Sequence, residues 1–240
     1  MRDGLAAILV SLLILLVSTT PVFAGPLIKS WNTSNGAKVM FVEAPSIPMI
    51  DVRLVFDAGS ARDNGKPGIA SLTNTLLSDG AGEWNADQLA EHFEDVGAIF
   101  STTSLRDMGI ISLRTLTDKE VLDSSLATLS KVLSSPGFQE DAIERRKKQV
   151  NVALEKQKES PSSTASIAFY QQLYGDHPYA HDSLGSVESI NAITRDDIVA
   201  WFKQYYVGRN AVIAIVGAVD RKQAEEIAER LMAEVPAGEK

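Results

Sequence analysis

Strand-like segments joined by very short turns constrain the fold of this chain more than any other feature. Residues 26–44 contain two such segments on either side of Asn35–Gly36, a dipeptide typical of hairpin turns. Residues 49–59 alternate apolar and polar side chains with the period of a strand, and residues 98–116 contain two further strand-like segments. Strands joined by short turns run antiparallel, because a parallel connection needs a dozen or more residues. We therefore expect a mainly antiparallel sheet.

Helix-like segments lie between and after these strands, with apolar residues at helical spacing. They cover residues 69–78, 85–97, 118–135, 140–161, 162–175, 194–206 and 221–235. An unbroken apolar run at residues 210–220 predicts a buried strand. This order favours an α+β domain, with a mainly antiparallel sheet and helices packed on one face, over a doubly wound parallel sheet. No linker or repeat interrupts it, so we expect a single domain at residues 25–240.

The first 24 residues have the pattern of an export signal. An almost wholly apolar run extends from Leu5 to Val17, and Val22 and Ala24 stand at the small-residue positions of a cleavage site. A helix of this run would be about 20 Å long, against roughly 30 Å of bilayer hydrocarbon. We predict a cleaved signal peptide at residues 1–24 and a periplasmic location, with an uncleaved anchor as the alternative.

Composition narrows the classes of function. The chain has no cysteine, which excludes disulfides and thiolate-bound metal, so an exported domain must be held together by its core. The formal net charge is −8. Nucleic acids need a basic face, so an acidic chain argues against such a partner and permits a basic peptide.

A polar stripe on the helix at residues 69–78 is the first candidate site. Ser71, Asn74 and Thr75 stand at positions i, i+3 and i+4 and therefore share one helix face. This spacing can aim three side chains at one metal ion, yet none of the three is a good metal ligand or general base. A solvent-exposed polar face is the alternative explanation.

The three histidines give little sign of a metal site. His92 lies on an amphipathic helix, where a structural role is the simpler interpretation. His177 and His181 are four residues apart, but Pro178 between them argues against the regular helix that would align them on zinc. A zinc site built on this pair remains an alternative that would need further ligands.

The chain resembles the pitrilysin/insulinase-type metallopeptidase family, whose zinc motif is H-x-x-E-H. The resemblance extends over residues 27–236 and includes the segments "VRLVFDAGSARDNGKPGIA" and "GAIFSTTSLRD". Its most specific part is the C-terminal stretch, which carries His177-Pro178-Tyr179, Gly185, Glu188, Ile190, Thr194, Asp197, Ile198, Phe202, Tyr205-Tyr206, Gly217 and Asp220.

This resemblance implies that the zinc motif is degenerate. Ser71 and Thr75 fall where the zinc histidines belong, Asn74 where the catalytic glutamate belongs, and Val152 where the third ligand belongs. Hydroxyl, amide and methyl groups are poor substitutes for imidazole and carboxylate, so we expect neither catalysis nor metal binding in this domain. Glu155 lies nearly one turn beyond Val152, and one carboxylate cannot rebuild the site.

The resemblance further implies a role in a peptidase assembly. We expect the first domain of a non-catalytic, peptide-binding subunit that completes the substrate chamber of a zinc-bearing H-x-x-E-H partner in a heterodimer. The family's substrate-pairing edge strand corresponds to Phe100, Ser101, Thr102, Thr103 and Ser104, although a solvent-facing strand would carry similar residues.

Two other functions stay open. One is an active zinc peptidase with displaced ligands such as Glu91, His92 and Glu155, so the sequence alone does not decide whether the chain is an enzyme. The other is a purely structural assembly subunit. No cofactor is expected in this domain, and contact with a membrane is expected only through the signal segment before cleavage.

Overall fold

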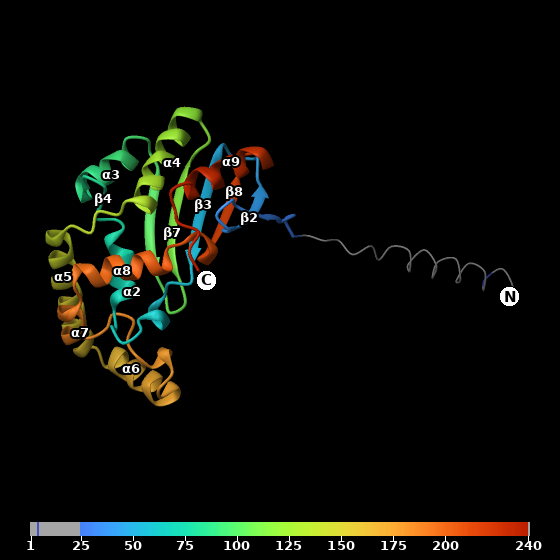
Figure 1. Ribbon diagram of the computed structural model, residues 1–240. Coiled ribbons are helices and arrows are strands. Elements are labelled where there is room, and N and C mark those ends of the chain that lie inside the picture. Colours follow the sequence, from blue (N-terminus) through green and yellow to red (C-terminus); the bar gives the residue numbers. More distant parts are fainter. Residues whose placement is uncertain (1–3, 5–24, 240) are drawn as a thin grey trace.

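A six-stranded sheet forms the centre of the computed structural model, which describes residues 4 and 25–239 (Figure 1). The predicted signal peptide lies outside the described residues except for residue 4. The strand order is β1-β2-β8-β3-β7-β6. Their bounds are β1 Lys29–Asn32, β2 Lys38–Glu43, β3 Met49–Phe56, β6 Ile99–Ser104, β7 Gly109–Leu116 and β8 Ala211–Gly217. All neighbours run antiparallel except β2 and β8, so the predicted mainly antiparallel sheet is confirmed.

Alternation along the central strands separates a buried face from an exposed one. In β3, Ile50, Val52, Leu54 and Phe56 are buried, whereas Asp51 and the other intervening residues are more exposed. The registers of β7 and β8 against β3 bring their own buried residues to the same face. Burying these apolar side chains contributes roughly 1.5–3 kcal/mol each, which makes this face the main source of stability.

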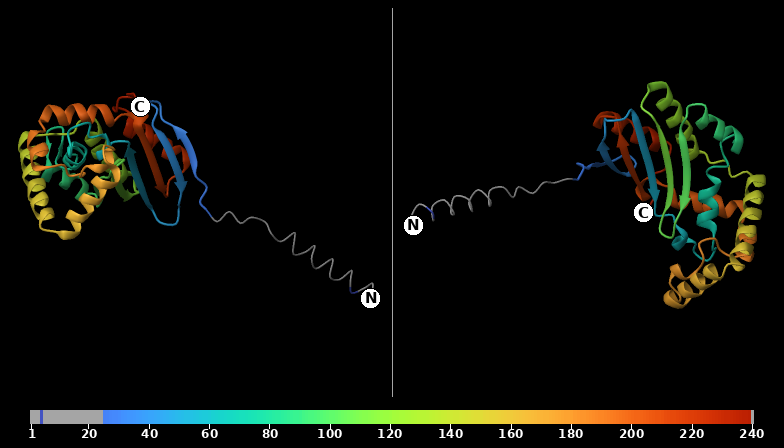
Figure 2. Two further views of the ribbon diagram at one scale, coloured as in Figure 1. Left: turned by 90° about the horizontal axis from the view of Figure 1, so that it is seen from below. Right: turned by 180° about the vertical axis from the view of Figure 1, so that it is seen from behind.

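Most of the helices lie on the side of that buried face (Figures 1 and 2). Their bounds are α2 Ile69–Leu76, α3 Ala86–Glu94, α4 Lys119–Ser134, α5 Glu140–Lys158, α6 Pro161–Tyr174, α7 Val187–Ala192, α8 Arg195–Tyr205 and α9 Arg221–Met232. Three 3-10 turns occur at η1 Ser60–Arg62, η2 Pro178–Ala180 and η3 Gly208–Asn210, and a short strand pair is formed by β4 Gly80–Ala81 and β5 Trp84–Asn85. The α+β class with helices on one face is thus confirmed. No helix in the described part of the chain has the length and apolar character needed to cross a bilayer.

Helix ends follow the local sequence. Asn85 and Thr194 cap α3 and α8, and each forms a capping box with the residue at the third helical position, Gln88 and Asp197.

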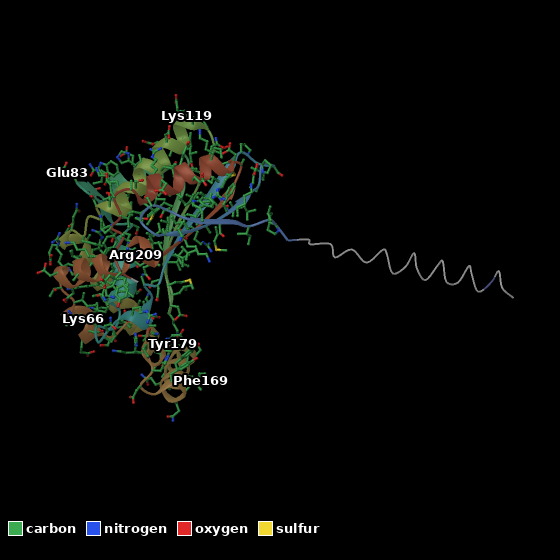
Figure 3. The ribbon with its side chains drawn as sticks, turned by 45° about the vertical axis from the view of Figure 1, so that its right-hand side comes forward. Lys66, Glu83, Lys119, Phe169, Tyr179 and Arg209 are labelled. Atoms are coloured by element: carbon green, nitrogen blue, oxygen red, sulfur yellow. The ribbon has the colours of Figure 1, made fainter. Side chains whose placement is uncertain are left out.

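Helix α6 differs from the others because none of its residues is buried. It lies at the far end of the α5–α6–α7 segment, away from the sheet (Figure 1). Phe169 and Leu173 are 61% and 58% exposed on it. Figure 3 shows Phe169 and Tyr179 close to this end of the molecule. The contacts of α6 are mainly with η2 and with α5.

Candidate functional site

Asp63 holds the start of α2, the helix that carries the polar stripe. The helix begins after Gly68, which adopts φ +94°, and it has no side-chain cap of its own. Instead, the Asp63 carboxylate accepts hydrogen bonds from the backbone N–H groups of Gly68 (2.8 Å) and Ala70 (3.0 Å). His181 Nε2 lies 3.0 Å from the same carboxylate. Burial raises the pKa of Asp63, while these hydrogen bonds oppose that shift.

Asn74 is the most buried member of the stripe, with 1% of its surface exposed. Its Nδ2 donates to the hydroxyl of Tyr206 at 2.9 Å and to the carbonyl of Ile110 at 3.4 Å. Burial raises the pKa of the Tyr206 phenol far above its ordinary value. A Cβ atom at position 109 would lie only 2.6 Å from the Tyr206 hydroxyl, so Gly109 leaves the space in which this bridge fits.

The polar stripe is therefore not a uniform face. Ser71 and Thr75 are half-buried, whereas Asn74 points into a filled contact between α2, β7 and the end of α8. Asn74 therefore does not face solvent, in contrast to the alternative explanation of the stripe. The reason lies in the tertiary structure. Helical periodicity predicts which residues share a face, but it does not predict that Tyr206 packs against this one.

Val152, which the resemblance places at the third ligand position, lies on the exposed side of α5, with 56% of its surface exposed. Helix α5 packs against α2. Arg146 donates from Nε (2.6 Å) and Nη2 (2.8 Å) to the carboxylate of Asp79, and Arg145 lies 3.6 Å from it. A bidentate ion pair therefore links the segment after α2 to α5.

The donors at the four positions do not suit zinc. Ser71 and Thr75 offer neutral hydroxyls, Asn74 directs its amide N–H groups to Tyr206 and Ile110, and Val152 has no lone pair. Among residues 4 and 25–239, no group of three or more His, Asp or Glu side chains is arranged to hold a metal ion.

The remaining candidate ligands have other contacts. His92 stacks on Trp84 with ring centroids 3.9 Å apart, and Glu155 accepts a hydrogen bond from Lys158 at 2.8 Å. His177 accepts from the backbone N–H of Tyr179 at 3.2 Å, and His181 faces Asp63. The structure does not bring these side chains together on one ion.

Arg106 anchors the segment that follows α6 and is a residue that sequence reasoning missed. Its guanidinium donates to the carbonyls of Tyr179 (2.8 Å) and His181 (3.2 Å) and lies 4.3 Å from the ring centre of Tyr170. The Tyr179 hydroxyl bonds to Asp107. Nothing in the sequence around Arg106 marks it as an anchor, because its partners lie more than 60 residues away.

The predicted substrate strand, β6, is at the edge of the sheet. It pairs with β7 on one side, and no strand lies beyond it within the described residues. The N–H of Leu105 bonds to the carbonyl of Met108 at 2.8 Å across the turn. Because hydrogen-bonded and non-bonded pairs alternate from there, the backbone groups of Phe100, Thr102 and Ser104 point away from β7. This edge could pair with an added strand.

Two family profiles match the chain. The profile described as Insulinase (Peptidase family M16) matches residues 38–186, and the profile described as Peptidase M16 inactive domain matches residues 192–240.

Similar proteins include both peptidase-like and non-peptidase homologues. An "Uncharacterized zinc protease" of Rickettsia bellii is 24% identical over 207 residues, which are 86% of this chain and 50% of that protein. The "Non-peptidase homolog YmxG" of Helicobacter pylori is 30% identical over 187 residues, 76% of this chain and 43% of that protein. The chain thus spans about half the length of the relatives that it matches.

Solved structures agree with the fold. The peptidase M16 inactive domain from Pseudomonas fluorescens superposes with a TM-score of 0.87 at 40% identity, covering 88% of this chain and 52% of that chain. The periplasmic protease PqqL from Escherichia coli superposes with a TM-score of 0.79 over 90% of this chain and 25% of that chain. Its identity of 16% supports the fold alone.

Proposed function

The chain belongs to the insulinase family of peptidases, M16, and from this premise we propose that it is a non-catalytic, polypeptide-binding subunit. In this proposal it completes the substrate chamber of a zinc-bearing homologue with an intact H-x-x-E-H motif, as a heterodimer in the periplasm. Zinc belongs to the partner, and this chain supplies binding surface.

The observation that carries the proposal is the bridge between Asn74 and Tyr206. A general base must accept a proton from the attacking water, and the Asn74 amide has no basic group for this. Its Nδ2 also donates to a buried phenol 2.9 Å away. The match to an M16 inactive-domain profile and the similarity to a non-peptidase homologue support the same conclusion.

Polypeptide capture is assigned to the open edge of β6. A substrate in an extended conformation would add a strand there, with its backbone bonded to Phe100, Thr102 and Ser104. The net charge of −8 favours basic substrate segments through long-range attraction.

The experiment compares two substitutions at Thr102. Thr102→Pro removes an N–H that points away from β7, so the ladder with β7 survives while the added strand loses a bond. Thr102→Val keeps the N–H and serves as the matched control. The chain is co-expressed with the H-x-x-E-H homologue of the same organism, and cleavage of a basic polypeptide is measured with and without it.

We expect cleavage to require both chains, to fall about tenfold with Thr102→Pro and to stay within about twofold with Thr102→Val. Zinc-dependent cleavage by this chain alone would instead support the active peptidase with displaced ligands. Stable association with no effect of either substitution on peptide affinity would support a structural subunit.

A further inference from the structure

A cavity of about 480 Å³ lies between the end of α5, helix α6 and the segment 181–188. It is separate from β6, because no residue of that strand lines it. We call it the α6 cavity, and its lining residues are Pro67, Leu154, Gln157, Lys158, Thr164, Ile167, Ala168, Gln171, His181, Asp182, Gly185, Ser186, Val187 and Glu188.

Most of the surface exposed inside the α6 cavity is apolar, although polar side chains stand among its lining residues. Leu154 is 5% exposed and forms the floor at the end of α5, and Ile167, Ala168 and Val187 add aliphatic surface from two further elements. The volume falls within the range of about 300–1,000 Å³ that binds small ligands or several side-chain groups. No residue of α6 is buried, so the side chains of this helix border the cavity without filling it.

The two basic side chains of the lining, Lys158 and His181, each face a carboxylate outside it, and neutral donors bond to Asp182. Lys158 Nζ lies 2.8 Å from Glu155, and the Asp182 carboxylate accepts from Gln157 Nε2 at 2.6 Å and from the N–H of Leu184 at 2.9 Å. His181 faces the carboxylate of Asp63. No uncompensated cation is therefore available to hold an anionic ligand.

Helix α6 has a composition that suits an apolar ligand. Residues 161–174 contain no charged side chain, although 22% of the whole chain is charged. Gln171 lines the cavity, and its uncharged amide can donate and accept hydrogen bonds. An apolar side chain of a peptide could pack against this wall, while the Gln171 amide hydrogen-bonds to the adjacent peptide bond.

We propose that the α6 cavity binds a bulky uncharged side chain of a polypeptide segment, as a second binding site apart from the β6 edge. The choice of polypeptide as the ligand rests on the proposed function, whereas the apolar site itself does not. A fatty acid is disfavoured because its carboxylate would lie beside Asp182 and Glu188 without a free cation.

The test uses the full chain and N-phenyl-1-naphthylamine, a neutral apolar dye that fluoresces on leaving water. Ala168→Trp places an indole in the cavity, and Ala165→Trp places the same group on α6 at a position that does not line it. We expect the dye to bind the native chain and Ala165→Trp alike, and to bind Ala168→Trp about tenfold more weakly. Thr164→Trp, also at the lining, serves as a second filling variant if Ala168→Trp does not fold.

Competition then identifies the ligand class. Acetyl-Gly-Ser-Phe-Ser-Gly-amide should displace the dye at a concentration about tenfold below that of the same peptide with Gly in place of Phe. If Ala168→Trp or Thr164→Trp bound the dye as tightly as the native chain does, the α6 cavity would not be the binding site. Displacement by laurate but not by the Phe peptide would overturn the assignment to polypeptide.

The dye-binding test of the α6 cavity can fail or succeed independently of the test of the proposed function. Thr102→Pro should leave dye binding unchanged, because Thr102 does not line the cavity. If peptide binding at β6 fails while the dye and the Phe peptide still compete, the proposed function falls and the α6 cavity stands. If β6 binds peptide but the cavity variants change nothing, only the inference falls.

Discussion

Asn74 stands where the family resemblance places a catalytic glutamate, and its side chain has become part of the core. The amide pairs with Tyr206, 132 residues away in the sequence, and so ties α2 to the end of α8. The ring of Tyr206 is in turn packed against Phe56 and Phe202, with centroids 4.6 and 4.8 Å apart. The Asn74 side chain thus forms a buried hydrogen bond that helps to hold the fold together.

Removing the Asn74 amide should destabilise the domain. Asn74→Ala leaves the buried Tyr206 hydroxyl without its partner, and we expect a loss of about 2 kcal/mol in the free energy of unfolding. Urea unfolding measures the loss, and Thr75→Ala on the half-buried part of the stripe should stay within about 0.5 kcal/mol. In Asn74→Ala/Tyr206→Phe the second substitution should cost less than it does alone, because the two groups are coupled. Strict additivity would contradict the bridge.

The lowered pKa of Asp197, at the start of α8, makes the free energy of unfolding depend on pH. The side chain of Lys66 and the backbone N–H of Thr194 lower the pKa of Asp197 from 3.8 to about 2. A lowered pKa stabilises the folded state above pH 3.8, and the contribution is lost as the pH falls towards 2. Because the pair is partly open to solvent, we expect Asp197→Asn to cost about 1 kcal/mol at neutral pH.

Unfolding curves across pH check this directly. The difference between the native chain and Asp197→Asn should shrink between about pH 4 and pH 2. Lys66→Met should show the same convergence, since it removes the other member of the pair. A constant difference over this range would contradict the role of the charge.

The polar stripe was predictable in position but not in contacts. Helical periodicity placed Ser71, Asn74 and Thr75 on one face, and the resemblance gave them their motif positions. The partners of the site could not be predicted from the local sequence. Asp63 meets His181 across 118 residues, and no spacing rule connects the two.

At the scale of elements, the strands with clear alternation or a long apolar run were predicted, as were the helices other than α7, which none of the predicted helical segments covers. The pair β4–β5 was missed because two residues per strand are too few for a periodic signal. The parallel pairing of β2 with β8 was missed as well, since it joins segments at opposite ends of the chain. Local sequence patterns predict the helices and strands. Which strands become neighbours depends instead on the packing of the whole core.

The packing of α2 on α5 makes a further prediction about the motif positions. If Ser71, Thr75 and Val152 occupy the ligand positions of the family, then Ser71→His/Thr75→His/Val152→Glu should bind zinc. Two histidines at i and i+4 on a helix with a carboxylate from a second helix supply a suitable donor set. Calorimetry should detect about one zinc ion per chain for the triple variant, together with a raised melting temperature.

The matched control moves one histidine off the stripe. Ser71→His/Ser78→His/Val152→Glu keeps the same donors at a half-buried position but sets the histidines two turns apart, so it should bind zinc far more weakly. Equal affinities of the two variants would show that the three positions do not converge.

At the scale of the whole molecule, stability is concentrated around the sheet. The described part of the chain has no disulfide to hold distant segments together, so each segment depends on its own packing. Strand β8 lies in the middle of the sheet with both neighbours bonded, and Ile213 and Ile215 on it are fully buried. Helix α6, by contrast, rests on η2 and borders a cavity.

This contrast predicts that α6 opens without unfolding of the domain. Few buried contacts hold the helix, so its amide hydrogens should exchange through a local opening that costs less free energy than global unfolding. Hydrogen exchange followed by mass spectrometry should show peptides from residues 161–174 exchanging before those from β8, at pH 7 and without denaturant. A saturating apolar peptide should slow exchange in α6 in the native chain but not in Ala168→Trp, because ligand in the cavity stabilises the closed helix. Equal protection of the amide hydrogens of α6 and β8 would mean that the two unfold together as one cooperative unit. The exposure of α6 would then not lower its local stability.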